Sequence, residues 1–517
     1  MKSSPNSTLL WGAILLILQN GYGFAQPIQL IPRKGEEVKQ DQATVPSALP
    51  QTLPEFWEGT PPSVIETYFP KVPLVLTSPV LRGLRTQLVK EKYTELLESL
   101  AYEKALLSLL IAEGEWEQAT ELLMETALPE KEPLLLDLLW FDRDSRKACE
   151  KITNLIRTAS NAEWKQQNIY CLYLNGEGER AKIAAEVLSE SNPRAAEFLS
   201  TLFNPSSKPP FDEFIAKSSF FLAVWLESQQ DIPEAELNKL SSSSLALIAR
   251  SEKAPLPTRL LAAEKALQQG LFKSEAFLVL LKEASHTGFW GQFMEASKSP
   301  RTEALLPLFE RAAQEKKIGL IGQVFSSSLS SLNPSLETLP LAPFMIQVFL
   351  QSDKKELAKK WGAFFMREAP DEAIAVLPLL HLAFPEIKWG ESQIQAWQAY
   401  ERRTHPTQAT QRSYALRRIL DAISEPSGQP MKGEPSPPSW RQEKALFDAQ
   451  VVGLLESAAD SKRKGEVLLL VLVTLGETPL HEYSVDKLAP FLKALYKVGY
   501  KEEARLLALE YLLAKGL

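Results

Sequence analysis

Residues that carry chemistry are scarce in this chain. Its 517 residues include only four histidines, and none of them lies in an H-E-x-x-H or similar metal-binding spacing. The sequence also lacks the G-x-S-x-G, G-x-x-x-x-G-K-[ST] and G-x-G-x-x-G motifs of hydrolases and nucleotide-binding proteins. The acidic residues stand beside lysine or arginine, as on solvated helix faces. We therefore predict no catalytic residue, no metal ligand and no cofactor.

A basic stripe and a long apolar run are missing as well. The formal net charge is −7, which argues against nucleic-acid binding. The most apolar window, Val467–Leu475, has nine residues between Glu466 and Glu477, whereas about 20 are needed to cross a bilayer. This window predicts a buried core helix, and we expect no transmembrane segment in the mature chain.

Glycine is scarce, with 23 residues, whereas proline is frequent, with 36. Few glycines with many leucines, alanines, glutamates and lysines favour helix throughout, and the prolines then separate the helices. Helical spacing of apolar residues is clear from position 81 onward, for example at Leu106, Leu109 and Leu110. The sequence predicts an all-α fold.

The first 25 residues have the pattern of a secretory signal peptide. Lys2 precedes the apolar run Leu9–Leu18, and Gly23 and Ala25 stand three and one positions before a cleavage point at Gln26. No cysteine stands directly after the run, which argues against lipid attachment. We expect secretion across the inner membrane and a periplasmic location.

The remaining chain divides by composition. Residues 26–80 are rich in proline and predict an extended leader that acts as a spacer; alternatively, its aromatic residues attach it to the folded body. Residues 81–424 predict a helical solenoid. Residues 425–440, with five prolines and two glycines, predict an exposed loop before a C-terminal helical segment at 441–517.

Four turns share a spacing in which a glycine or aspartate precedes an alanine by five positions. The first residue permits a tight turn, and the alanine allows the following helix to approach the preceding one closely. In two cases a proline follows twelve residues after the alanine, at Pro193 and Pro370. The pattern predicts antiparallel helical hairpins at Gly114 and Ala119, Gly176 and Ala181, Asp353 and Ala358, and Gly499 and Ala504.

The segments GEWEQATELL, GEGERAKIAAEVLSESNP and GYKEEARLLALEYL resemble second helices of tetratricopeptide-type repeats. The alanines match the small packing position of that family, and Pro193 and Pro370 match its terminal proline. This resemblance implies an irregular α-solenoid of antiparallel helical hairpins that binds other proteins. The stretch from Leu106 to Phe277 also resembles uncharacterised exported helical proteins of alphaproteobacteria.

The only two cysteines, Cys149 and Cys171, lie in two predicted helices that flank a turn at Ser160 and Asn161. Each is about eleven residues from Ser160, so in an antiparallel hairpin both stand about 16 Å from the turn. An oxidising compartment permits a disulfide between them. Two buried free thiols, packed as small apolar side chains, are the alternative. We expect the disulfide.

Stacked helical hairpins form extended surfaces that bind proteins without reactive groups. The leading hypothesis is therefore a non-catalytic exported scaffold with a protein partner, in envelope assembly, secretion or motility. One alternative is a cell-wall lytic enzyme, since soluble lytic transglycosylases resemble this chain in having an exported α-superhelix. Their catalytic glutamate would correspond to Glu391, followed by Ser392, although their Gly-Leu-Met-Gln stretch is missing. A periplasmic carrier of a small ligand is the other alternative.

Overall fold

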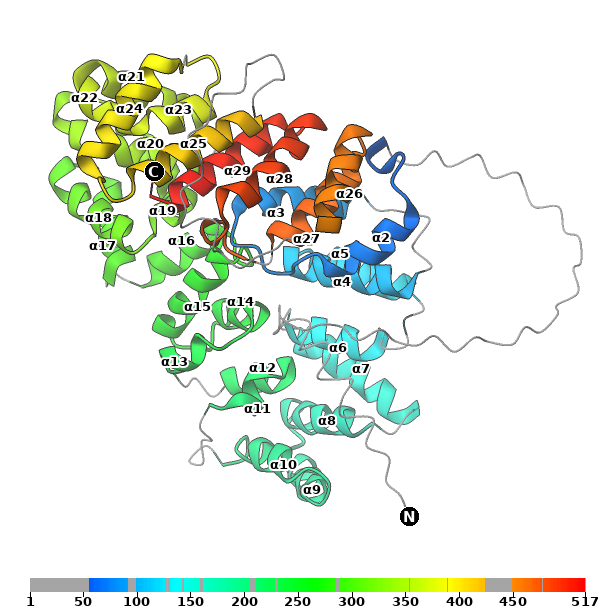
Figure 1. The fold of residues 1–517 in the computed structure, drawn as a ribbon. Helices are drawn as coiled ribbons and strands as arrows, with labels where there is room; N and C mark the ends of the chain where they lie inside the picture. The colour runs from blue at the N-terminus through cyan, green and yellow to red at the C-terminus, as the bar shows by residue number, and fades with distance from the viewer. Residues whose placement is uncertain are drawn as a thin grey trace, which may run out of the picture.

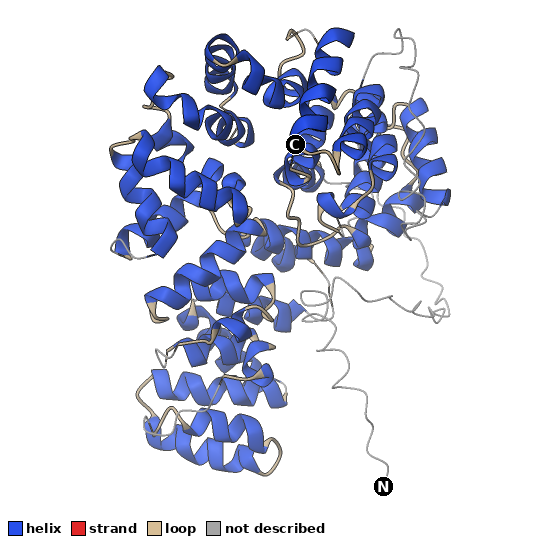
Figure 2. Cartoon of the chain, turned by 60° about the vertical axis from the view of Figure 1, so that its left-hand side comes forward, coloured by secondary structure: helices blue, strands red, loops and turns tan. Residues whose placement is uncertain are grey.

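The computed structural model describes residues 55–91, 99–126, 128, 131–141, 144–158, 161–204, 211–227, 231–284, 288–352, 354–387, 389–423, 449–476 and 478–516. Every regular element in these ranges is a helix, so the predicted all-α, solenoid-like class is confirmed (Figure 2). The predicted signal peptide, the first part of the predicted leader and the predicted loop 425–440 lie outside the described residues.

The first half of the chain runs from the N-terminal helices to the lower end of the molecule and back (Figure 1). Its helices are η1 (Glu55–Trp57), α2 (Pro62–Tyr68), η2 (Phe69–Lys71), α3 (Pro79–Lys90), α4 (Leu100–Glu113), α5 (Trp116–Glu125), α6 (Lys131–Phe141), α7 (Ser145–Thr158), α8 (Ala162–Leu174), α9 (Gly178–Ser189), α10 (Pro193–Ser200), α11 (Glu213–Ala216), α12 (Ser219–Leu226), α13 (Glu234–Leu237), α14 (Ser242–Arg250) and α15 (Leu256–Gln268).

The second half forms the upper part of the molecule and returns to the N-terminal helices (Figure 1). Its helices are α16 (Ser274–Glu283), α17 (Gly288–Lys298), α18 (Thr302–Gln314), α19 (Ile318–Leu329), η4 (Leu336–Leu341), α20 (Ala342–Gln351), α21 (Lys355–Glu368), α22 (Pro370–Ala373), η5 (Ile374–Val376), α23 (Leu377–Ala383), α24 (Glu391–Thr404), α25 (Ala409–Ile423), α26 (Ala449–Asp460), α27 (Lys464–Leu475), η7 (Leu480–Glu482), α28 (Val485–Lys497) and α29 (Lys501–Ala514).

Local sequence explains where these helices begin and which faces they bury. Asn192 caps α10 by accepting a hydrogen bond from the Ala195 N–H, and Pro193 occupies the first turn, where its missing N–H costs nothing. On α4, the predicted stripe of Leu106, Leu109 and Leu110 is at most 1% exposed. Helices that follow one another pack together, as α8 does with α9 and α20 with α21.

The structure differs from the expected extended leader over residues 55–78. These residues contain η1, α2 and η2, and Trp57 and Phe69 are almost completely buried. Pro62 lies in the first turn of α2 and so starts a helix instead of preventing one. The aromatic residues attach this segment to the folded body, as the alternative interpretation proposed, because η1 and α2 pack against α27.

Helix α27 packs against helices from both ends of the chain. It contacts η1, α2 and α3 from the N-terminal part of the chain and α26 and α28 from the C-terminal part, while α29 packs against α3. These helices lie together in Figure 1. Residues 467–472 are completely buried, as predicted for a core helix. Within the described residues, no helix is long and apolar enough to span a membrane. The segment after the predicted loop is therefore built into the same body as the N-terminal helices.

Candidate functional site

The predicted hairpin turns share one backbone geometry. Gly114, Gly176 and Gly499 all adopt positive φ angles, of 77°, 80° and 105°. In each turn the residue after the glycine donates its N–H to a carbonyl five residues earlier, as Glu115 does to Leu110 at 2.9 Å. This six-to-one bond marks a Schellman helix end, which requires a left-handed residue at the glycine position.

The four predicted alanines, Ala119, Ala181, Ala358 and Ala504, are completely buried. Asp353 lies outside the described residues, but the next residue, Lys354, donates its N–H to the Phe349 carbonyl at 3.0 Å. The second helix of each turn packs on the first. The spacing therefore identifies places where two consecutive helices make close contact.

Two further turns have the same geometry but were missed by the sequence pattern. Lys316 and Lys462 both have φ of 56°, and the following residues make six-to-one bonds of 2.7 and 2.9 Å to Ala312 and Ala458. Five positions after these lysines stand Ile321 and Val467, both completely buried, in place of alanine. The sequence pattern required a glycine or aspartate followed by an alanine, so it could not detect these two turns.

The structure places the two cysteines at disulfide distance, as predicted. The Sγ atoms of Cys149 and Cys171 are 2.05 Å apart and join α7 to α8. Asn161 caps α8 by accepting the Glu163 N–H at 2.8 Å, so the predicted turn lies between the two helices. Both cysteines are buried, which makes the bond an internal link of this hairpin.

Helix α9 follows this hairpin at the lower end of the molecule (Figure 1). It exposes two aliphatic side chains. Ile183 is 61% exposed and Val187 is 64% exposed, and a spacing of four residues places them on the same side of the helix. Tyr173 and Leu174, at the end of α8, are 40% and 45% exposed. Single exposed apolar residues are common, but four of them on two consecutive helices, α8 and α9, indicate an interaction surface.

The charged side chains of α9 and of the turn before it are mainly negative. Arg180 pairs with Glu177, and Lys182 pairs with Glu179 at 2.7 Å. Within the described residues, the exposed carboxylates of Glu186 and Glu190 have no ion pair. The apolar face is therefore bordered by uncompensated negative charge. We call the exposed side chains of α9, Ile183, Glu186, Val187 and Glu190, together with Tyr173 and Leu174 at the end of α8, the α9 surface.

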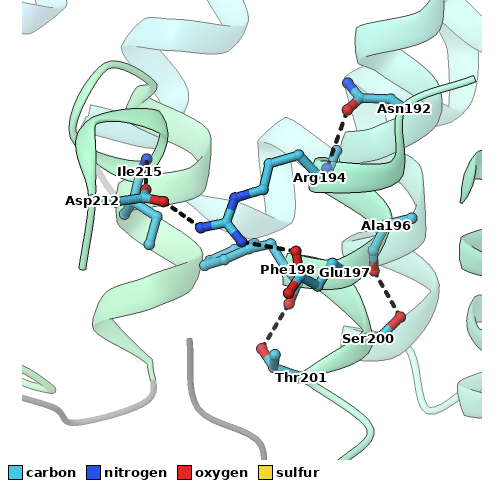
Figure 3. Close-up of polar contacts among 10 residues, drawn as sticks. Asn192, Arg194, Ala196, Glu197, Phe198, Ser200, Thr201, Asp212 and Ile215 are labelled. Carbon is cyan, nitrogen blue, oxygen red and sulfur yellow. Dashed lines mark hydrogen bonds and ion pairs between the residues drawn. The ribbon is translucent and has the colours of Figure 1, made fainter. Parts of the chain in front are cut away.

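An ion-pair cluster holds the neighbouring helices in place (Figure 3). Arg194 on α10 pairs with Glu197 at 2.8 Å on its own helix and with Asp212, which precedes α11. Asp212 also accepts the Ile215 N–H at 3.1 Å and so caps α11. The Arg194 guanidinium lies 5.8 Å from the centre of the Phe214 ring. The ion pair thus joins α10, against which α9 packs, to the beginning of α11.

No conventional reactive site is found in the part of the chain that the structure describes. No group of three metal-ligating side chains occurs there. His381 is half-buried, whereas His286 and the side chain of Glu391 lie outside the described residues. Trp361 and Trp397 are completely buried and pack in the core.

Two carboxyl groups between α6, α8 and α12 have raised pKa values. Burial raises the pKa of Asp137 to about 6, although the hydroxyl of Ser219 donates a hydrogen bond to it. Burial and the nearby charge of Asp137 raise the pKa of Glu163 to about 7. The Asp137–Ser219 hydrogen bond joins α6 to α12, and Glu163 on α8 lies close enough to Asp137 for their charges to interact.

Comparison with known proteins gave no match: neither a family model, nor a curated protein, nor a solved structure is similar to this chain.

Proposed function

We propose that this protein is an exported, non-catalytic scaffold that binds a partner protein through the α9 surface. The observation that carries the proposal is the pair of exposed aliphatic side chains, Ile183 and Val187, at the outer end of an otherwise well-buried helical body. The resemblance to tetratricopeptide-type repeats supports the same class of function. Export rests on the signal-peptide pattern of residues 1–25.

The chemistry of the surface defines the partner. Aliphatic side chains at i and i+4 fit the apolar face of an amphipathic helix. The carboxylates of Glu186 and Glu190 favour lysine or arginine beside that face, because opposite charges speed association and select the partner. The partner is therefore a protein with an apolar helical segment flanked by basic residues.

A site-specific cross-linking experiment tests the proposal. A photoreactive amino acid at position 187, introduced into the full chain in its native host, should form a cross-link to one partner protein. The double variant Ile183→Glu and Val187→Glu should lose this partner in affinity capture. Val279→Glu, which alters an equally exposed aliphatic residue on α16, is the matched control and should retain it.

Two outcomes would contradict the proposal. One is an unchanged set of captured proteins in the double variant. The other is a partner whose cross-linked segment is acidic or lacks apolar residues. Circular dichroism and thermal melting of each variant show whether its fold is intact, because substitutions at exposed positions change stability little.

A further inference from the structure

A cavity lies in the upper part of the molecule, far along the chain from the α9 surface. Its volume is about 270 Å³, and it opens between α23, α25, α28 and α29. Three aliphatic side chains, Leu382, Leu420 and Ile423, form its apolar wall, and all three are buried. Three polar side chains share the lining: His381, Tyr496 and Arg505. An apolar pocket with a few convergent polar groups is the usual form of a small-molecule site.

Arg505 provides a positive charge at the wall of this cavity. Its guanidinium carbon lies 5.7 Å from the centre of the Tyr496 ring, and the ammonium of Lys501 lies 5.0 Å from the same centre. In the described part of the chain, no carboxylate forms an ion pair with Arg505. A guanidinium that is held by an aromatic ring, without a carboxylate partner, is suited to an anionic ligand.

His381 is held in one orientation and adds a second polar contact. Its Nδ1–H donates to the Ile387 carbonyl at 2.7 Å, and its ring stacks against Trp389. This leaves Nε2 as the acceptor of the neutral ring. Burial and the charge of Arg505 lower the pKa of His381, against the opposing effect of the hydrogen bond to Ile387, and so favour the neutral ring. Arg505 is therefore the cation that the lining of the cavity offers to an anionic ligand.

The size and the lining define the ligand. The volume is just below the range for drug-sized molecules, which restricts the occupant to a small molecule. Its anionic end would pair with Arg505, and its hydrocarbon part would lie on Leu382, Leu420 and Ile423. We propose that this cavity binds a small amphipathic carboxylate, so that the scaffold also carries a small-molecule site.

Binding of hexanoate to the full mature chain, measured by titration calorimetry and ligand-observed NMR, tests this proposal. Hexan-1-ol has the same hydrocarbon chain without the charge, and inorganic phosphate has charge without the chain. Hexanoate should bind saturably, and both other probes should bind at least about tenfold more weakly. Arg505→Gln should weaken hexanoate binding by roughly tenfold or more, because it removes the charged partner.

Two further variants separate a specific effect from misfolding. Arg505→Lys keeps the charge and should restore most of the affinity, whereas Arg402→Gln alters an exposed arginine on α24 that does not line the cavity and should change nothing. The proposal is overturned if hexanoate shows no saturable binding, if hexan-1-ol or phosphate binds equally well, or if a folded Arg505→Gln variant binds hexanoate as the wild type does.

Discussion

At the scale of single residues, the backbone of five turns follows a simple rule. Each turn needs a left-handed position, and glycine meets this need without strain because it has no Cβ. The sequence made three of these turns visible through Gly114, Gly176 and Gly499. It concealed two others, because lysine rarely adopts a positive φ and nothing in the residue type indicates it. Local spacing thus predicts a turn only where the residue suited to it is present.

Replacing Lys316 or Lys462 by glycine should stabilise the protein. Both lysines are held at φ of 56°, which is unfavourable for a residue with a Cβ. Part of that strain is offset by the greater freedom of glycine in the unfolded chain, so we expect a gain of about 0.5–1 kcal/mol for each substitution. Chemical denaturation at 25 °C measures it. Gly114→Ala is the opposite control and should destabilise; a loss of stability in both lysine variants would contradict the argument.

At the scale of secondary-structure elements, most helices could be predicted but some contacts between them could not. The i, i+3, i+4 spacing of Leu106, Leu109 and Leu110 identifies α4 and its buried face without further information. The prolines of residues 55–78 instead predicted an extended segment, although helices form there. A proline ends a helix in one position and starts it in another, so its presence alone does not exclude a helix. The burial of Trp57 against α27 is a contact over about four hundred residues, which local pattern does not encode.

The cysteine link between α7 and α8 should stabilise the lower end of the molecule. Because it closes a loop with a sequence separation of 22 residues, its removal should lower the free energy of unfolding by roughly 3 kcal/mol. The double variant Cys149→Ala and Cys171→Ala, compared with the wild type by chemical denaturation, measures this loss. Adding a reductant should affect only the wild type. Two thiols that can be alkylated in unreduced, denatured protein would show that the bond is absent.

Gly465→Ala should loosen the N-terminal segment from α27. A Cβ at position 465 would lie 2.5 Å from a Trp57 ring carbon and 2.9 Å from the Phe56 carbonyl oxygen, so the segment must shift. We expect a loss of about 1–3 kcal/mol, with faster hydrogen exchange over residues 55–76. Gly453→Ala on α26 is the matched control, because nothing lies within 4 Å of its added Cβ. A similar change in both variants would contradict this account.

At the scale of the whole molecule, the two ends of the chain meet in a polar junction at α3, where the Ser78 hydroxyl donates a hydrogen bond to Glu510 of α29. Arg85 on α3 is completely buried; it pairs with Glu113 at 2.6 Å and donates to the Pro73 carbonyl at 2.9 Å. Arg82, on the same helix, donates to the Gln268 carbonyl of α15 at 3.3 Å. These contacts join α3, α4 and α15, and they require partners that no local sequence pattern connects. Closure of the chain is therefore the part of the fold that sequence reasoning could not supply.

The exposure of Ile183 and Val187 on the α9 surface could not be predicted from the sequence either. Ile183 and Val187 have the spacing of an ordinary buried stripe, and the same helix buries Ala181, Ala185 and Leu188 on its other side. Periodicity alone cannot show which of two apolar stripes faces the neighbouring helices. The packing of α9 between α8 and α10 decides it, and this packing depends on the tertiary structure.

Glu510 of α29 belongs to the closing junction and should make it sensitive to pH. Its carboxylate accepts a hydrogen bond from the Ser78 hydroxyl at 2.7 Å, at the beginning of α3. Burial raises the pKa of Glu510 to about 7, against the opposing effects of Ser78, the charge of Arg82 and the Val80 N–H. The folded state therefore holds a proton that the unfolded chain releases near pH 4.5. Protonated Glu510 therefore contributes to the free energy of unfolding. This contribution is fully present below pH 4.5 and is lost as the pH rises through 7.

Glu510→Gln tests this linkage, because glutamine has the shape of the protonated side chain and carries no charge. The histidines complicate the absolute pH profile, since burial lowers the pKa of His381 and His405 and thus favours unfolding at acid pH. The difference between variant and wild type removes their contribution. At pH 8 the variant should be the more stable protein, and the difference should shrink towards zero at pH 5. A difference that is constant between pH 5 and pH 8, measured by chemical denaturation, would show that Glu510 does not titrate at this junction.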